Sequence, residues 1–159
     1  MNGTGAWNDA TCTFNEVERM ELQYRGEVTA QFSVNGGGTG GEFPINLLKQ
    51  GKESWNKWYQ TNSNTSWVKI AVDAPINVRG FGFVSANDMP QRDPDSVKVT
   101  VDGVVVGTFK LVYNARWQTL NFLDNINVTG KVFQFDFSNS KTKEIQLGEI
   151  IFYHLKGSL

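Results

Sequence analysis

Residues 132–137 read VFQFDF, a stretch in which three phenylalanines alternate with Gln134 and Asp136. Successive side chains of a β-strand point to opposite faces of its sheet, so this pattern predicts a strand with one aromatic, buried face. The alternation is the clearest periodic signal in the chain, and it indicates a β-structure whose core is built around this strand.

Runs of the same kind occur along most of the sequence. We expect strands at residues 28–34, 67–72, 76–84, 97–101, 104–112, 117–122, 132–137 and 145–153. The Asp102-Gly103 pair between two β-branched runs predicts a tight hairpin turn. Helical periodicity is weak throughout the chain. Residues 14–24 are the best candidate helix, but residues 17–24 can equally form a strand.

About eight short strands without an alternating β–α pattern predict an all-β chain, folded as a single-domain antiparallel β-sandwich. The 159 residues suit one domain, and a composition of 40% hydrophobic and 19% charged residues is that of a globular protein. We place the sandwich at residues 27–159 and interpret residues 1–26 as an N-terminal extension or a first strand.

Charge and hydropathy exclude two classes of partner. The formal net charge is −1 and no basic residues cluster along the chain, so the sequence does not predict a nucleic-acid-binding surface. No apolar stretch approaches the ~20 residues of a membrane span. The first ten residues lack the apolar core of a secretory signal, which favours an intracellular protein or a domain excised from a larger one.

The sequence also argues against an enzyme. Cys12 and His154 are the only cysteine and histidine, too few for a structural zinc site or a disulfide within the chain. No local motif for a cysteine or serine nucleophile surrounds either residue. The predicted loops carry several acidic residues, but spacing in sequence cannot show the fixed separation that glycoside hydrolysis requires. Few classes of enzyme remain, and we expect no cofactor.

Three segments, in order, resemble the discoidin family, also called the coagulation factor 5/8 type C domains. The first, within residues 42–58, has Asn46-Leu47-Leu48 followed by Lys57-Trp58. The second has Ser85-Ala86-Asn87-Asp88, then Arg92-Asp93-Pro94, then Asp102-Gly103. The third has Arg116, Thr119 and Phe122, and closes with residues 145–150, IQLGEI.

The resemblance covers about residues 27–153 and implies a galactose-binding-like jelly roll that binds ligands with loops at one end of the sandwich. Many members of the family carry an aspartate of a calcium-binding loop where this chain has Lys49. Calcium prefers six to eight oxygen ligands, and residues 49–53 offer one carboxylate and two ammonium groups. Calcium near Lys49, Gly51 and Glu53 is therefore only a weak candidate.

A sugar-binding site combines an aromatic face with planar polar groups. The aromatic candidates are Trp55, Tyr59 and Trp117, and we expect at least one of Trp55 and Tyr59 to be exposed. Arg92 and Arg116 are the polar candidates, although Arg92 and Asp93 can instead pair with each other or order their own loop.

Two other tryptophans are assigned to the core. Trp58 matches the family's Lys-Trp motif, and Trp67 lies in an apolar strand, so neither is a candidate for the site.

The sequence thus leads to a non-catalytic module whose ligand is a glycan. The alternative is an intracellular adaptor domain that binds a protein ligand. The Asn-Leu-Leu-Lys segment and the later Lys-Trp are also similar to a single-strand-break-repair scaffold of the same fold superfamily. A shared jelly roll does not by itself decide between these functions.

Overall fold

The computed structural model describes residues 14–22, 28–32, 41–49, 56–113 and 120–158. Eleven strands occur among these residues: β1 (Val17–Arg19), β2 (Val28–Phe32), β3 (Trp58–Thr61), β4 (Thr65–Val78), β5 (Gly80–Val84), β6 (Ser96–Val101), β7 (Val104–Lys110), β8 (Leu120–Leu123), β9 (Val128–Ser138), β10 (Glu144–Leu147) and β11 (Glu149–Leu155). Three short 3-10 turns accompany them: η1 (Phe14–Glu16), η2 (Pro44–Leu48) and η3 (Pro90–Arg92). None of the helical turns in this part of the chain has the length and hydropathy needed to cross a bilayer.

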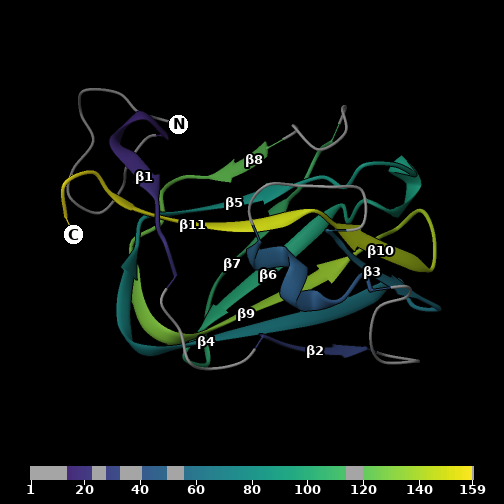
Figure 1. The fold of residues 1–159 in the computed structure, drawn as a ribbon, viewed down its shortest axis with the longest axis horizontal. Coiled ribbons are helices and arrows are strands. Elements are labelled where there is room, and N and C mark those ends of the chain that lie inside the picture. Colours follow the sequence, from purple (N-terminus) through teal and green to yellow (C-terminus); the bar gives the residue numbers. More distant parts are fainter. Residues whose placement is uncertain (1–13, 23–27, 33–40, 50–55, 114–119, 159) are drawn as a thin grey trace.

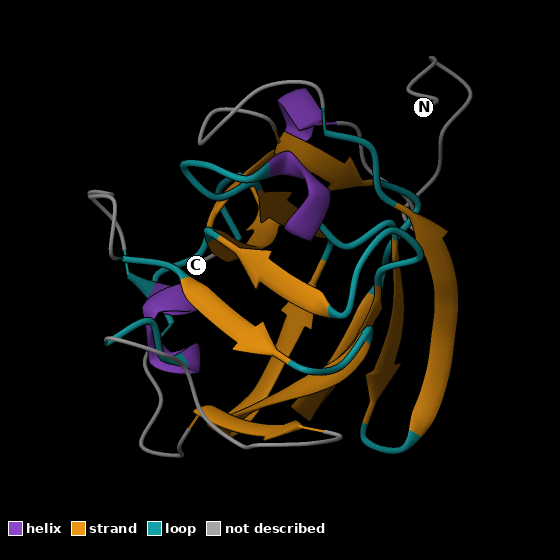
Figure 2. Ribbon diagram, turned by 90° about the vertical axis from the view of Figure 1, so that its right-hand side faces the viewer, coloured by secondary structure: helices purple, strands orange, loops and turns teal. Residues whose placement is uncertain are grey.

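The strands form two layers, as predicted for a β-sandwich (Figure 1). One layer is a five-stranded sheet in the order β2-β4-β9-β6-β7. The other contains a four-stranded sheet in the order β1-β11-β5-β8 and the two-stranded pair β10-β3. All the pairs are antiparallel. Figure 2 shows the layers after a quarter turn.

The core between the layers is aromatic, and the alternation in residues 132–137 builds it. Phe133, Phe135 and Phe137 are at most 1% exposed and point from β9 toward the opposite layer. There Phe81 makes edge-to-face contacts, with ring centres 6.2 Å from Phe133 and 5.4 Å from Phe135. Such contacts add to the stabilisation that comes from removing the rings from water. Trp58 is fully buried against Phe137, so its predicted place in the core is confirmed.

Two predictions about strands are wrong in detail. The expected strand at residues 76–84 is divided, because β4 ends at Val78 and β5 begins at Gly80. The expected strand at residues 145–153 is divided at Gly148, whose N–H binds the carbonyl of Val84. Its first part pairs with β3 and its second part with β5. One predicted strand therefore contributes to two sheets.

The prediction that Trp67 is a core residue is also wrong. Val68 and Ile70 of β4 are fully buried, so the alternation of the strand turns Trp67 to the outer face. It is only partly buried there, and the ammonium of Lys69 lies 5.2 Å from its ring centre. The ambiguous segment at 14–24 forms η1 and then β1, which pairs with β11. Residues 23–27 lie outside the described residues, so the domain boundary proposed at residue 27 stays a prediction.

The predicted hairpin turn at Asp102-Gly103 is confirmed. Both residues have positive φ angles, 49° and 83°, as a two-residue turn between β6 and β7 requires. The Asp102 carboxylate also accepts hydrogen bonds from the backbone N–H groups of Lys131 and Val132 on β9. This side chain joins the turn to the central strand of the five-stranded sheet.

Candidate functional site

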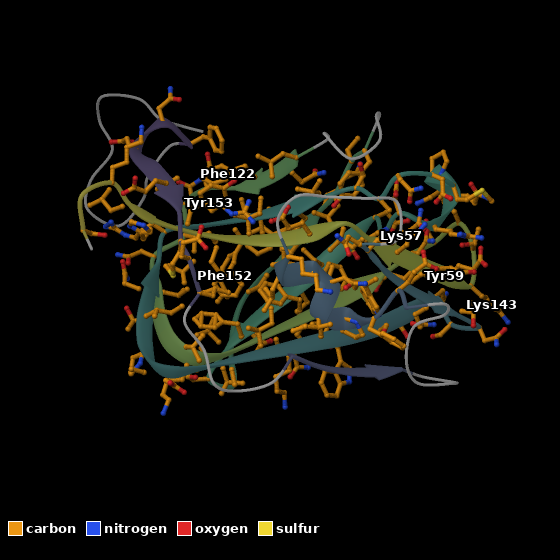
Figure 3. All side chains as sticks on the ribbon, in the orientation of Figure 1. Lys57, Tyr59, Phe122, Lys143, Phe152 and Tyr153 are labelled. Carbon is orange, nitrogen blue, oxygen red and sulfur yellow. The ribbon has the colours of Figure 1, made fainter. Side chains whose placement is uncertain are left out.

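Three strand connections and one strand extension meet at one end of the sandwich, which we call the loop end. They are residues 62–64 between β3 and β4, 85–95 between β5 and β6, 139–143 between β9 and β10, and 111–113 after β7. In Figure 3 the labelled Lys57, Tyr59 and Lys143 lie together at this end, away from Phe122, Phe152 and Tyr153. Loops held by a rigid sandwich are a frequent location of binding sites.

The first feature of the loop end is a cluster of Tyr59, Arg92 and Glu144. The Arg92 guanidinium carbon lies 4.3 Å from the centre of the Tyr59 ring, within the range of a cation–π contact. Arg92 Nε donates a hydrogen bond of 3.2 Å to Glu144 Oε1, and the Tyr59 hydroxyl donates to Glu144 Oε2. One carboxylate thus accepts hydrogen bonds from both side chains, and these contacts hold Arg92 over the aromatic ring.

This arrangement changes the protonation equilibria of the cluster. Burial and the hydrogen bond to Glu144 raise the pKa of Tyr59 to about 12. The hydrogen bonds from Tyr59 and Arg92 lower the pKa of Glu144, because they stabilise the ionised carboxylate. At neutral pH the cluster therefore holds a neutral phenol, a carboxylate and a guanidinium.

The second feature is a polar network around Lys57, which is only 3% exposed. Its ammonium donates to Asp88 Oδ1 at 2.8 Å and to Gln146 Oε1 at 2.9 Å, and it lies 3.4 Å from Glu42 Oε2. An ammonium has three hydrogens, so these contacts match its donor capacity. Burial alone would raise the pKa of Asp88, but the hydrogen bond and charge of Lys57 outweigh it and lower that pKa.

The same network anchors the connection that carries Arg92. Gln146 donates through Nε2 to the backbone carbonyls of Asp88 and Met89. Met89 has a φ angle of 47°, a left-handed conformation that a residue with a side chain adopts only when its surroundings hold it. Asn139 then ties Gln91 to β10, because its Nδ2 donates to the carbonyl of Gln91 at 2.9 Å and to that of Glu144 at 2.7 Å.

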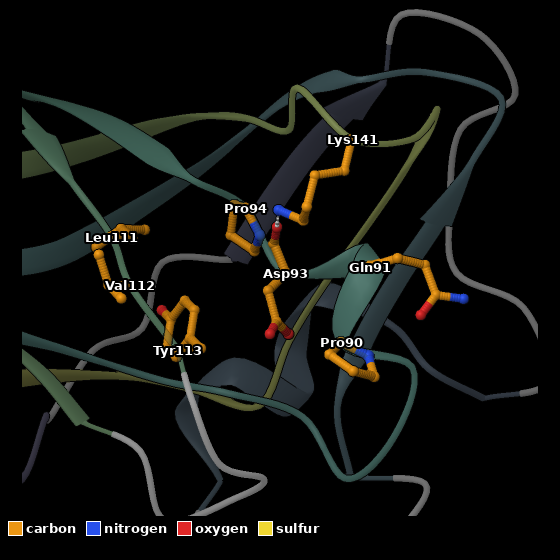
Figure 4. Close-up of a pocket in the computed structure, with 8 residues that line it drawn as sticks. All are labelled: Pro90, Gln91, Asp93, Pro94, Leu111, Val112, Tyr113 and Lys141. Atoms are coloured by element: carbon orange, nitrogen blue, oxygen red, sulfur yellow. Dashed lines mark hydrogen bonds between the residues drawn. The ribbon is translucent and has the colours of Figure 1, made fainter.

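The third feature is a pocket of about 370 Å³ beside these residues (Figure 4). It lies between residues 90–94, which include η3, and residues 111–113 after β7, with Lys141 on the remaining side. Asp93 is buried, Tyr113 is half-buried and Lys141 is exposed. The Lys141 ammonium donates to the Asp93 carbonyl at 2.8 Å and lies 3.7 Å from a carboxylate oxygen of Asp95.

The chemistry of the pocket is mixed. Pro90, Pro94, Leu111, Val112 and the ring of Tyr113 give it apolar surface, while Gln91, Asp93 and Lys141 supply an amide, a carboxylate and an ammonium. Pockets that bind small molecules combine apolar walls with a few placed polar groups in this way. The arrangement suits a ligand that has both an apolar face and several hydroxyl groups.

The structure brings two of the five predicted site residues together, namely Tyr59 and Arg92. Tyr59 is 8% exposed and belongs to strand β3 instead of a loop. Trp55, Arg116 and Trp117 lie outside the described residues. For calcium, Lys49 is exposed after η2, whereas Gly51 and Glu53 are not described. Within the described ranges, no three acidic, histidine or cysteine side chains converge as metal ligands.

Sequence reasoning missed several residues of the loop end, because their roles depend on pairing between distant segments. Glu144 and Gln146 reach the site only because β10 pairs with β3. Gln146 gave a weak signal, as a polar residue between two apolar neighbours in the closing strand. Tyr113 and Lys141 carried no signal of their own. Lys57 was identified only as part of the family's Lys-Trp motif.

Comparisons with known proteins identify the fold. No family model matches the chain, and no curated protein does. Solved structures do match. A fucose-binding module of Streptococcus pneumoniae, SpX-3, superposes with a TM-score of 0.64 at 12% identity, covering 87% of this chain and 99% of its own. The family 32 carbohydrate-binding module of Clostridium perfringens NanJ, in complex with galactose, gives 0.64 at 7% identity, covering 80% and 93%.

A third neighbour is the lectin-binding domain of Lectinolysin complexed with Lewis b. Its TM-score is 0.61 at 9% identity, covering 87% of this chain and 98% of that domain. These identities establish a shared fold and nothing finer. The expected galactose-binding-like jelly roll is therefore confirmed, because these neighbours share that fold with the discoidin domains. Membership of the discoidin family itself stays a prediction.

Proposed function

We propose that this chain is a non-catalytic carbohydrate-binding module that holds its glycan at the loop end. The single observation that carries the proposal is the pocket in which Asp93, Tyr113 and Lys141 meet. It lies at the end of a jelly roll whose structural neighbours include modules crystallised with galactose and Lewis b.

The residues of the pocket match the chemistry of a sugar ring. The C–H face of a pyranose packs on an aromatic ring, and the half-buried Tyr113 offers one at the wall. Adjacent hydroxyls donate to a carboxylate and accept from an ammonium, which Asp93 and Lys141 supply. A site built from such groups rejects a ring that lacks the matching hydroxyl, since a buried polar group then stays unpaired.

The Tyr59–Arg92–Glu144 cluster supports the proposal as a preorganised neighbour of the pocket. Arg92 has a side chain that is 20% exposed, and its planar guanidinium is already oriented by Glu144 and Tyr59. Binding then requires little ordering of this side chain, and preorganisation lowers the entropic cost of association. Trp55, Arg116 and Trp117 remain proposed contributors to the same surface.

A protein-binding adaptor is the second candidate. It is favoured by one observation, the exposed apolar side chains of Phe43, Ile45 and Met89, which are 48%, 39% and 38% exposed. Phe43 and Met89 directly follow Glu42 and Asp88, two of the residues that contact Lys57. Exposed apolar patches mark interaction surfaces, but a pocket with both apolar and polar lining residues fits a glycan better.

The test is a glycan array with calcium and again with a chelator, followed by titration calorimetry of any sugar that binds. Lys141→Ala and Tyr113→Ala should each weaken binding at least about tenfold, a loss of about 1.4 kcal/mol. Lys98→Ala is the matched control, because Lys98 is an exposed lysine on the outer face of β6. A blank array from a folded sample would contradict the proposal and favour the adaptor. Binding that both variants retain would contradict the pocket.

A further inference from the structure

Trp67 gives the outer face of the five-stranded sheet an aromatic side chain among polar ones. It is half-buried on β4, and β9 and β6 continue the sheet beside it (Figure 1). The strand pairing places Asp136 of β9 opposite Trp67, and Lys98 of β6 opposite Asp136. Neighbouring strands are ~4.8 Å apart, so this row of three residues spans about 10 Å of the face.

A second row of side chains lies two residues further along the same strands. It consists of Lys69 of β4, Gln134 of β9 and Thr100 of β6. The Lys69 ammonium is 5.2 Å from the centre of the Trp67 ring, within the range of a cation–π contact. Gln134 Nε2 donates to both carboxylate oxygens of Asp136, at 3.3 Å. We call the two rows together the sheet-face cluster.

This face is basic, although the whole chain has a formal net charge of −1. Lys69 and Lys98 belong to the cluster, and Lys110 of β7 is exposed on the same face, opposite Ser96. Asp136 is the single carboxylate among the described side chains of these rows. Within the described part of the chain, none of the three lysines lies at ion-pair distance from a carboxylate. Their charges are therefore available to a ligand.

The acidic side chains at the rim of the face lie outside the two rows. Asp95, which precedes β6, lies 3.7 Å from the ammonium of Lys141. Asp102 accepts hydrogen bonds from the backbone of β9 at the hairpin turn. Asp73 is exposed beyond Ala71, where the β4–β9 register shifts. The excess of positive charge thus belongs to the rows around Trp67.

We propose that the sheet-face cluster binds an acidic linear glycan, a chain of uronic acids. A uronic acid ring has a C–H face that packs on the Trp67 indole and a carboxylate that pairs with the adjacent Lys69 ammonium. Its hydroxyl groups match the acceptors and donors of Asp136 and Gln134, which already orient each other. The next ring of the chain follows the row across the strands to Lys98.

Other polyanions complement this face less well. Asp136 stands in the middle of the first row, where it repels the closely spaced phosphates of a nucleic acid but accepts from a sugar hydroxyl. An acidic peptide has carboxylates but lacks the rigid C–H face of a sugar ring. The cluster shares no residue with the lining of the loop-end pocket, so this second site does not depend on the first.

The experiment titrates the chain by calorimetry with hexamers of galacturonate, mannuronate and glucuronate, each compared with its neutral, carboxyl-reduced counterpart. We expect at least one acidic hexamer to bind at least about tenfold more tightly than its neutral counterpart. Its affinity should fall between about 50 mM and about 500 mM salt, because salt screens exposed charges. No binding of any acidic hexamer, or equal binding of the neutral ones, would overturn the proposal. Equally tight binding of hexaglutamate or oligothymidylate would do the same, since it would show unspecific attraction of polyanions.

Variants on the outer face locate the site. Trp67→Ala should weaken binding of the acidic hexamer at least about tenfold, and Trp67→Phe, which keeps an aromatic ring, should be the milder change. Lys98→Ala should weaken it about threefold or more, and this variant stays decisive even if Trp67→Ala does not fold, because Lys98 is exposed. Lys156→Ala is the matched control, since it removes an exposed lysine beyond β11.

The same variants separate this site from the loop-end pocket. Lys98→Ala should affect the acidic hexamer and leave a sugar in the pocket unaffected, whereas Tyr113→Ala should do the reverse. Binding of the acidic hexamer that survives both Trp67→Ala and Lys98→Ala would overturn the proposal. Binding that is lost in Tyr113→Ala would also overturn it, because the acidic glycan would then occupy the pocket.

Discussion

Arg92 and Tyr59 stack in the structure, with the guanidinium carbon 4.3 Å from the ring centre, and both side chains bind the carboxylate of Glu144. Arg92 belongs to η3 and Tyr59 to β3, and both β4 and β5 lie between these two elements in the sequence. Their contact fixes the connection between β5 and β6 against the β3–β10 pair. Changes to either residue should therefore alter both the stability of the chain and the shape of the loop end.

Tyr59→Phe should lower the free energy of unfolding by about 1–3 kcal/mol, since it removes a hydrogen bond to a charged group and keeps the ring. Urea denaturation at pH 7 measures the change. Without that hydrogen bond the pKa of Glu144 should rise toward its ordinary value, because Tyr59 is the main cause of its lowering. Unchanged stability together with an unchanged Glu144 titration would refute the hydrogen bond.

The decrease of stability at alkaline pH should depend on the ionisation of the same tyrosine, Tyr59. The folded chain holds the pKa of Tyr59 at about 12, above the ordinary 10.0. A raised pKa means that the folded state keeps its proton longer, so this contribution is complete below about pH 10 and is lost as the pH rises toward 12. Absorbance at the tyrosinate band, as the difference between wild type and Tyr59→Phe, should show one residue ionising late.

The decrease of stability at acidic pH should follow the protonation of three carboxylates. Contacts in the folded chain lower the pKa values of Asp88, Asp95 and Glu144. A lowered pKa gives stability that is present above the unfolded pKa, about 4 for such groups, and lost as the pH falls through the folded value. The urea midpoint should thus stay flat from pH 7 to about 5 and then decrease. Asp95→Asn should make that decrease shallower, whereas a midpoint that rises on acidification would contradict the sign.

Asp88→Ala should destabilise the chain more than a surface aspartate does. Lys57 is buried and loses its 2.8 Å partner, keeping Gln146 and the more distant Glu42. We expect about 1–3 kcal/mol in urea denaturation, as for the loss of a hydrogen bond between charged groups. Lys98→Ala, at an exposed position on the outer face of β6, serves as the control and should stay within about 0.5 kcal/mol. Equal effects would show that the Lys57 network contributes nothing.

Asp102→Ala tests the hairpin turn. The carboxylate accepts two backbone hydrogen bonds from β9, at 3.1 and 2.8 Å, and the residue has a φ angle of 49° that alanine tolerates poorly. The loss should be about 2 kcal/mol. Asp102→Asn preserves an oxygen acceptor and the tolerance for this φ, so thermal denaturation should show it to be the milder change. The reverse order would show that the hydrogen bonds from β9 to the Asp102 carboxylate do not stabilise the turn.

Much of the fold follows from local sequence. The alternation in residues 132–137 lies in β9, and residues 97–101 and 104–112 enclose the Asp102-Gly103 turn, because period two and turn chemistry act between near neighbours. The divisions at Arg79 and Gly148 were not predicted, since hydrophobic residues resume on the far side of each break. Each division lies where one strand ends and the next begins to pair with a different strand. This change of partner is set by the tertiary fold and not by local sequence.

The site was predictable only in part, for the same reason. Tyr59 and Arg92 could be selected by residue type, but their shared partner Glu144 comes from a strand distant in sequence. Lys57 is a lysine that becomes buried because Asp88 and Gln146 converge on it. The local sequence around Lys57 does not indicate that residues from two other segments will bind its ammonium.

The division of the closing run at Gly148 links the loop end to the completion of folding. Glu144 and Gln146 precede it in β10, and β11 follows it directly between β1 and β5. A slip of one residue in this run would turn its side chains to the other face and take the carboxylate away from Arg92. Chains with many contacts between remote segments fold slowly. A ligand for the loop end would therefore work as a conformational probe that recognises correctly aligned chains and ignores misregistered ones.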